Sequence, residues 1–365
     1  MKYTTLGALC KKGSSNIAQK DLEGNSGDYE IYGASGLIKK VDFYHQEKPY
    51  IAIVKDGAGV GRAMLLPAKS SVIGTMQYII PNDNVDIRYL YYAIVNMNLG
   101  RYYMGAAIPH IYFKDYESER LPLLDCNEQK KIAGVLEQID LLIDDRKEQL
   151  IKLDELVKSR FIELFGDPET NPYGWKKATI GDVCYSIVRG PFGSALKKEF
   201  FVEPDESTYK VYEQKHAIQK SATIGTYYVT AEKFAELKRF ECVAGDILMS
   251  CSGTMGELYQ LPNGCEKGLI NQALCKFTLN EKILPIVFLT YMKQTIGNLE
   301  TKGSGIQNIA AVSYVKAMPI NLPPIEVQTE FAAFVEQTNK SKLAVKQSLE
   351  KLETLKKALM QEYFG

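Results

Sequence analysis

The side chains best suited to metal or redox chemistry are spread through the sequence without the spacing of a site. The three histidines, His45, His110 and His216, do not lie at the separations expected of metal ligands. The seven cysteines include no Cys-x-x-Cys pair, which argues against a zinc ribbon or a thioredoxin-like centre. We therefore expect no metal site, and free buried thiols in a reducing cytoplasm.

Two further patterns could be mistaken for catalytic or nucleotide-binding motifs. Asn171-Pro172-Tyr173 matches part of the Asn-Pro-Pro-Tyr motif of adenine methyltransferases, but the second proline and a convincing methyl-donor loop are missing. Gly57-x-Gly59-x-Gly61 lacks an acidic ribose partner, the sequence has no P-loop, and tight turns explain these glycines better. The sequence predicts no catalytic residues and no cofactor bound by this chain, with a nuclease built on scattered carboxylates as an alternative.

The elements that would position any site occur twice in the chain, as an internal sequence repeat. Gln129–Gly166 aligns with Gln328–Gly365 at a shift of 199 without a gap, and both segments end in Phe-Gly. Apolar residues recur in both at alternating steps of three and four, which is typical of a coiled-coil seam. Each segment predicts a helix of roughly 57 Å. A glycine suited to the C′ position follows each helix, and Asp125-x-x-Glu128 could form a capping box before the first.

Polar residues interrupt both apolar stripes, and the second stripe is the weaker one. Because a single long helix could not bury its stripe, we expect the two helices to pair with each other. The alternative is that each helix packs only on its own globular domain. The interrupting residues are Arg146 and Arg160 in the first stripe, and Thr338, Lys342 and Lys356 in the second.

The segments before each helix also match. Thr5-Leu-Gly-Ala-Leu-Cys10 corresponds to Thr179-Ile-Gly-Asp-Val-Cys184, and the segment 51–61 corresponds to 246–256. Short β-rich runs and glycine turns predict mixed domains. The expected strands are Pro49–Val54, Gln77–Ile80, Thr226–Val229 and Asp246–Ser250, and the expected short helices are Tyr89–Met97 and Ile286–Ile296.

The predicted fold class is α+β, with two mixed α/β domains alternating with two long helices that pair as an antiparallel coiled coil. The predicted segments are 1–124, 125–166, 167–324 and 325–365. Such a pseudo-twofold arrangement is typical of proteins that read similar DNA sites at a fixed separation. The two domains differ most between 11–48 and 185–242, which suits two different specificities.

The charge balance does not by itself indicate DNA. The chain has 44 basic and 44 acidic residues. The two domains are also nearly neutral: residues 1–124 have 14 basic and 12 acidic residues, and residues 167–324 have 17 basic and 16 acidic residues. Nucleic-acid-binding proteins usually have an excess of positive charge. A DNA-binding groove would therefore have to be locally basic, or partner subunits would have to supply phosphate contacts.

Several motifs resemble the specificity subunits of type I restriction-modification systems, and the second half of the chain is the closer match. The first half fits more loosely, through Asp56-Gly-Ala-Gly-Val-Gly61 and the start of the first long helix. The motifs of the second half are Gly166-Asp-Pro-x-x-Asn171-Pro-Tyr-Gly-Trp175, Arg189-Gly-Pro-Phe-Gly-Ser194, Gly245-Asp-Ile-Leu-Met-Ser250, Ser252-Gly-Thr-Met-Gly256, Gly303-x-Gly305 with Asn308-Ile309, and Leu322-Pro-Pro-Ile-Glu-x-Gln328.

The resemblance implies a non-catalytic, cytoplasmic subunit with two target-recognition domains and two helical conserved regions. It implies binding to double-stranded DNA with a bipartite sequence and a nonspecific spacer. It also implies two modification (methyltransferase) subunits as partners, with restriction subunits in the full complex, and S-adenosylmethionine held by the modification partner. No membrane association is expected, since no apolar run approaches the roughly 18 residues of a membrane span.

Polar and basic loop residues are the natural candidates for DNA contact. A second hypothesis, favoured by the neutral charge, is a non-catalytic adaptor whose two domains bind something other than DNA. The candidates for DNA contact are Lys11, Lys12, Lys39, Lys40, Lys55, Arg62 and His110 in the first domain, and Arg189, Lys197, Lys198, Lys215, Lys220 and Gln307 in the second.

Overall fold

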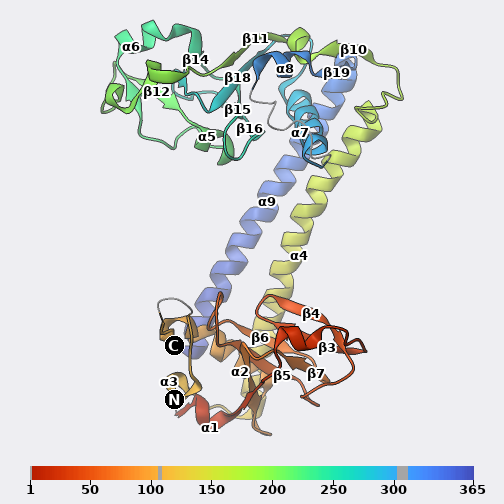
Figure 1. The fold of residues 1–365 in the computed structure, drawn as a ribbon, viewed down its shortest axis with the longest axis vertical. Coiled ribbons are helices and arrows are strands. Elements are labelled where there is room, and N and C mark those ends of the chain that lie inside the picture. The colour runs from red at the N-terminus through yellow and green to blue at the C-terminus, as the bar shows by residue number, and fades with distance from the viewer. Residues whose placement is uncertain (1, 106–108, 302–310) are drawn as a thin grey trace. The chain divides into compact units, whose positions relative to one another are not determined.

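The computed structural model describes residues 2–105, 109–301 and 311–365. The chain divides into two compact units, Met1–Gln149 with Ala344–Gly365, and Leu150–Leu343. Each unit contains one mixed α/β domain together with part of each long helix, α4 (Cys126–Phe165) and α9 (Ile325–Phe364) (Figure 1).

The first domain, which we define as β1 to β9, contains two small sheets and a closing strand pair. An antiparallel sheet has the order β2-β8-β5-β6, a second sheet has the order β4-β3-β7, and β1 pairs with β9. Its elements are β1 (Tyr3–Thr5), α1 (Leu6–Leu9), β2 (Cys10–Ser14), β3 (Tyr29–Gly33), β4 (Gly36–Val41), β5 (Tyr50–Val54), β6 (Ala63–Leu66), β7 (Ser70–Val72), β8 (Met76–Pro81), α2 (Ile87–Asn96), α3 (Phe113–Tyr116) and β9 (Arg120–Pro122).

The second domain, which we define as β10 to β19, repeats this plan. Its sheets have the orders β11-β18-β15-β16 and β13-β12-β17-β14, and β10 pairs with β19. Its elements are β10 (Lys176–Thr179), β11 (Cys184–Arg189), β12 (Tyr209–Tyr212), α5 (Gln214–Ile218), β13 (Tyr228–Val229), α6 (Ala231–Glu236), β14 (Glu241–Cys242), β15 (Ile247–Ser250), β16 (Leu258–Gln260), β17 (Gly268–Ile270), β18 (Leu274–Leu279), α7 (Pro285–Thr301), α8 (Val312–Ala317) and β19 (Pro319–Leu322).

The repeat in the sequence is therefore a repeat of topology. In both domains the second sheet named above contains one parallel pair, β3 with β7 in the first domain and β12 with β17 in the second. Strand β14, together with α5 and α6, lies in the longer insertion of the second domain. The expected α+β class and the match between the two halves are confirmed. The strand expected over Thr226–Val229 is shorter, because only Tyr228 and Val229 pair with β12.

Both long helices begin and end as the sequence indicates. The Asp125 carboxylate accepts hydrogen bonds from the backbone N–H groups of Asn127 and Glu128, so it caps α4. Gly166 and Gly365 follow the two helices with φ of +75° and +86°. Only glycine adopts this left-handed conformation at little cost, which explains why both copies end in Phe-Gly.

The two long helices pair antiparallel within each unit, as predicted. In the first unit the Arg146 guanidinium donates to the Ser348 hydroxyl, and the Lys356 ammonium contacts the Asp140 carboxylate. In the second unit Arg160 pairs with Glu330. These three polar residues therefore serve the pairing, because each finds a partner on the facing helix.

The remaining two interruptions are also satisfied. Lys342 pairs with Asp154 at 2.6 Å. Thr338 is buried, and its hydroxyl donates to the backbone carbonyl of Phe334 at 2.9 Å within its own helix. A buried polar group that keeps its hydrogen bond costs little, so the weaker second stripe still forms a stable contact.

The ends of the long helices also belong to the domain cores. In the first unit Ala133 and Leu136 of α4 lie in one buried cluster with Met360 and Phe364 of α9 and Tyr89 of α2. In the second unit Phe161, Phe165 and Phe331 form edge-to-face pairs at 4.6–5.5 Å. Each domain is therefore packed onto its own helix pair rather than joined to it by a flexible linker.

One buried histidine, His216, is held neutral in the second domain. The Nδ1 atom of His216 accepts from the Glu213 N–H at 2.8 Å, and its Nε2–H donates to the Ile224 carbonyl at 2.7 Å, which is the bonding of a neutral ring. Burial lowers the pKa of His216, so the unfolded chain takes up this proton at a higher pH than the folded chain. We expect the stability of the second domain to fall as pH drops from about 6.5 towards the folded pKa, by at most about 1.4 kcal/mol per pH unit.

Urea unfolding at pH 7.5 and 5.5 tests this expectation. His216→Phe should reduce the loss of stability between the two pH values, whatever its effect at pH 7.5. His45→Asn, a change at a histidine outside the core, is the control and should leave the pH dependence as in the wild type. An equal loss in the wild type and the His216 variant would contradict the assignment.

Candidate nucleic-acid interface

A tight glycine loop joins β5 to β6 in the first domain. Gly57, Gly59 and Gly61 have φ of +84°, +87° and +86°. A Cβ atom on Gly61 would lie 2.2 Å from the backbone nitrogen of Gly100, so no larger residue fits without displacing the backbone. The expectation that these glycines form turns is confirmed. The Gly57 N–H donates to the Pro109 carbonyl at 2.9 Å, which holds this loop beside the segment around His110.

The two neighbouring segments bring three polar side chains together. The Asp56 carboxylate contacts Nδ1 of His110, and the Lys55 ammonium lies 3.7 Å from the same carboxylate. The Tyr112 ring lies 4.1 Å from the His110 ring and is half exposed. The Arg62 guanidinium lies against Gly59, because a Cβ atom placed on Gly59 would be 2.4 Å from it. This edge of the domain offers cationic, aromatic and hydrogen-bonding groups to a ligand.

The corresponding loop of the second domain joins β15 to β16 and is held by side chains. The Ser250 hydroxyl donates to the Thr254 carbonyl at 2.6 Å and accepts from the Glu257 N–H at 2.9 Å. The Gln214 amide donates to the carbonyls of Ser252 and Thr254. The loop is therefore fixed from both sides before any ligand arrives.

A cationic hollow of about 280 Å³ lies in the second domain. Its ionisable lining residues are Arg189, Arg239 and Lys316, and the Phe192 ring, which is 67 % exposed, lies at its edge. The Arg189 guanidinium is 5.4 Å from the centre of that ring. Positive charge with an exposed aromatic ring is the combination that contacts phosphates and bases. Local positive charge therefore exists although the chain as a whole is neutral.

Two thiols lie beneath this region. The Cys275 thiol donates to the sulfur of Cys251, and this hydrogen bond, aided by the charge of Arg189, lowers the pKa of Cys251. The same hydrogen bond, together with burial, raises the pKa of Cys275. Both side chains are buried, so they pack the core beneath the loop and do not face a substrate.

A family model for the type I restriction modification DNA specificity domain matches residues 1–154 and 172–355. The chain belongs to this family. A specificity subunit is a non-catalytic subunit of a type I restriction-modification system. The two matched segments follow the repeat, since each includes one mixed domain and most of the long helix that follows it.

Known specificity subunits resemble this chain in sequence and in fold. The specificity subunits of the type I restriction enzymes MjaVIII and MjaIX from Methanocaldococcus jannaschii are 28 % identical over 137 residues and 30 % identical over 126 residues. These matches cover 36 % and 29 % of this chain, and only 32 % and 29 % of the archaeal proteins.

Solved structures have the same fold across the chain. The S subunit of a type I restriction-modification system from M. genitalium superposes with a TM-score of 0.58 at 16 % identity, covering 100 % of this chain and 96 % of that one. A second solved chain comes from a structural study of complex assembly and conformational transition of the type I restriction-modification system. It superposes with a TM-score of 0.62 at 15 % identity, covering 99 % of this chain and 97 % of that one.

The candidates in the first specificity domain lie on three elements. Lys55, Arg62 and His110 gather at the glycine loop described above. The exposed residues Lys11 and Lys12 lie on β2, at the edge of the antiparallel sheet. Lys39 and Lys40 lie on β4 in the other sheet, where the Lys39 ammonium donates to the Leu22 carbonyl.

Most basic candidates of the second specificity domain already have intramolecular partners. Arg189 donates to the carbonyls of Gln272 and Cys251, and Lys220 pairs with Glu257. Lys215 pairs with Glu213 at 2.7 Å, and Lys197 lies 3.6 Å from Glu199. Lys198 is exposed, and Gln307 lies outside the described residues. These partners compete with DNA for the cationic groups.

Several residues at this surface carried no signal in the sequence. Arg239 and Lys316 come together with Arg189 although they are far from it in the chain. Gln214 holds the loop through its amide. A motif scan weighs neighbouring residues, so it does not detect residues that only the folded chain assembles.

Asn171-Pro172-Tyr173 is a structural turn. Asn171 exchanges hydrogen bonds with the backbone of Trp175, and the Tyr173 hydroxyl donates to the Glu163 carbonyl at the end of α4. The Trp175 indole N–H donates to the Phe165 carbonyl. These bonds join α4 to the second specificity domain, which explains why Asn171 stands here.

The described part of the chain contains no cluster of three or more histidine, cysteine, aspartate or glutamate residues arranged to hold a metal ion. Among residues 2–105, 109–301 and 311–365, no helix has the length and apolar character needed to cross a membrane.

Proposed function

We propose that this chain reads a bipartite DNA sequence for a type I restriction-modification complex, with one half-site for each specificity domain. The observation that carries the proposal is the duplication of the unit, with the same strand order in the antiparallel sheet and with a glycine-containing loop held at the same place in both copies. Duplex DNA offers two half-sites at a fixed separation, and two readers in one chain can diverge to read different bases.

The proposed DNA-facing surface of the first domain is the loop cluster of Lys55, Arg62 and His110. In the second domain it is the hollow lined by Arg189, Arg239 and Lys316. Phosphate contacts would hold each domain in register, and polar loop side chains would read base edges. The other basic candidates remain proposed phosphate contacts.

The proposed partners follow from the family. Two modification subunits would bind the chain, restriction subunits would join in the full complex, and S-adenosylmethionine would be held by the modification subunits. A subunit that acts on DNA in this way would work in the cytoplasm of its cell.

Removal of two cationic side chains from the hollow is expected to weaken DNA binding. Arg239→Ala with Lys316→Ala removes two side chains that could each neutralise a phosphate, so the slope of log K against log salt should fall by about 1 for each of them. Filter binding of the chain assembled with its modification subunits, over a salt series, measures this slope. The chain alone provides a second arm.

A charge-matched control keeps the result interpretable. Lys340→Ala with Lys346→Ala removes two lysines from α9, outside both proposed surfaces, and should leave the slope unchanged. Equal decreases in both double variants would contradict the assignment of the hollow. If the wild-type chain bound no DNA with or without partners, the adaptor hypothesis would be favoured instead.

A further inference from the structure

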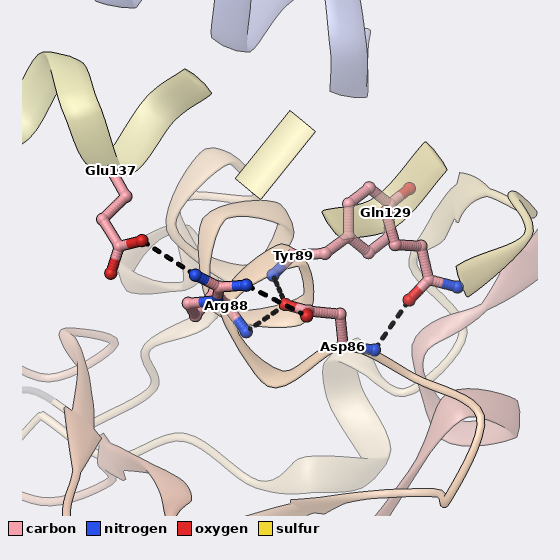
Figure 2. Close-up of polar contacts among 5 residues, drawn as sticks. All are labelled: Asp86, Arg88, Tyr89, Gln129 and Glu137. Carbon is pink, nitrogen blue, oxygen red and sulfur yellow. Dashed lines mark hydrogen bonds and ion pairs between the residues drawn. The ribbon is translucent and has the colours of Figure 1, made fainter. Parts of the chain in front are cut away.

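One buried glutamine ties the first specificity domain to its long helix. Gln129 lies in the first turn of α4 and is 3 % exposed. Its Oε1 atom accepts from the backbone N–H of Asp86 at 2.8 Å (Figure 2). Its Nε2 atom donates to the Leu124 carbonyl at 2.9 Å. Asp86 caps α2 by accepting from the N–H groups of Arg88 and Tyr89. The glutamine therefore joins the starts of two helices.

The repeat has the same joint in the second unit. Gln328 lies in the first turn of α9 and is 1 % exposed. Its Oε1 atom accepts from the backbone N–H of Leu284, directly before α7, at 2.9 Å. Its Nε2 atom donates to the carbonyls of Pro323 and Lys282 at 3.0 and 2.9 Å. Pro323 precedes Gln328 by the same five positions that separate Leu124 from Gln129.

An uncharged amide side chain satisfies both joints, because it carries an acceptor and a donor at the same end. Each site presents a backbone N–H that needs an acceptor and at least one carbonyl that needs a donor. A glutamate has acceptor oxygens but no donor when ionised, and an apolar side chain leaves buried groups on both sides without partners. The bonds go to backbone atoms, so the joint works whatever residues the domain carries at those positions.

Two contacts between side chains flank the first joint. The Arg88 guanidinium pairs with Glu137 of α4 at 2.8 Å, and the Tyr92 hydroxyl donates to Asp140 at 3.0 Å. Figure 2 shows Arg88 between Asp86 and Glu137. The Arg88 and Glu137 side chains are 36 % and 47 % exposed, so water screens this pair. The glutamine is more deeply buried than this ion pair, and both of its hydrogen bonds go to backbone atoms.

We propose that Gln129 and Gln328 are positioning residues that fix the tilt of each specificity domain on its own long helix, and that this tilt sets which spacer lengths the protein accepts. The inference rests on the proposed reading of a bipartite target. A reading surface about 25 Å from the joint moves by one base-pair step, about 3.4 Å, when the domain tilts by roughly 8°. A small loss of stiffness at the joint is therefore enough to weaken the preference for one spacer length over its neighbours.

The test uses the full chain assembled with its modification subunits. The target is first mapped by methylation with the wild-type chain, and the half-sites are then placed on DNAs whose spacer is shortened or lengthened by one or two base pairs. The wild type should methylate the native spacer much faster than its neighbours. Gln129→Met and Gln328→Met, which keep the side-chain length, should each reduce that preference about ten-fold or more, with the bases read in both half-sites unchanged.

A matched control separates positioning from general destabilisation. Gln77 is also a buried glutamine of the first domain, but its amide contacts the Tyr116 hydroxyl inside the domain and not the long helix. Gln77→Met should lower stability and leave the spacer preference as in the wild type. If Gln129→Met does not fold, Gln129→Glu, which keeps the acceptor for Asp86, takes its place and should show the same loss of preference.

Three results would overturn the inference. The first is an unchanged spacer preference in the folded joint variants. The second is an equal loss of spacer preference in Gln77→Met. The third is a loss of half-site base preference that matches the loss of spacer preference. The proposed function fails separately, and earlier, if the wild-type complex methylates no specific sequence at all.

Discussion

Replacing residues 11–120 with the equivalent region of a related specificity subunit is expected to change one half of the recognised DNA sequence. The other half and the spacer should survive. The exchanged region begins after β1 and ends at Arg120, the first residue of β9, which faces Thr5. The rest of the closing strand pair and both long helices therefore remain. Gln129 also remains, and it needs only a backbone N–H at position 86.

The size of the change follows from the energetics of mismatched bases. Each mismatched base pair costs roughly 1–3 kcal/mol, so a half-site that differs at two positions should shift the preference by about thirty-fold or more. The two domains lie in different compact units, and sites that share no contacts contribute nearly additively. Methylation mapping of the hybrid with its modification subunits measures the outcome. A change in both halves, or in the spacer, would contradict two independent readers.

A single methyl group at Gly190 is expected to disable the second specificity domain. A Cβ atom there would lie 1.9 Å from the backbone oxygen and 2.3 Å from the backbone carbon of Asn271, and neither atom belongs to a flexible side chain. Asn271 also donates its N–H to the Tyr212 carbonyl and accepts from the Leu274 N–H, so any displacement passes into β12 and β18. We expect Gly190→Ala to destabilise this domain by about 3 kcal/mol or more.

Gly134→Ala is the matched control for this substitution. Gly134 lies within α4, and a Cβ atom there would meet no heavy atom within 4 Å. Alanine favours the helix, so this change should stabilise the protein by roughly 0.5–1 kcal/mol. Urea unfolding followed by tryptophan fluorescence suits the comparison, because Trp175 lies at the entry to the second domain. Similar unfolding midpoints for Gly190→Ala and the wild type would show that the backbone can yield.

A chain that carries two copies of a reading unit can change the bases read by one copy while its helix and its joint stay the same. In this protein the two buried glutamines that hold each domain to its helix, Gln129 and Gln328, bond only to backbone atoms. Side chains in the domains are then free to vary without loss of the fold.

The sequence by itself determined the two long helices, their glycine ends and the order of domain, helix, domain, helix. These features follow from local rules, since helical periodicity and the left-handed preference of glycine depend on neighbouring residues. The match between the two copies also predicted the topological repeat, because similar sequences bury similar patterns. The motif set was sufficient to predict the family.

Only the tertiary structure decided which polar residues support the fold and which face a ligand. Arg146 and Lys356 interrupt two apolar stripes in the sequence. Their partners Ser348 and Asp140 come within reach only when the two helices pair antiparallel. Arg189 looked like a free DNA contact, yet it bonds backbone carbonyls of distant loops. Partners separated by more than fifty residues come together through sheet topology and helix packing, and a linear pattern records neither. The role of Gln129 depended on the same long-range geometry.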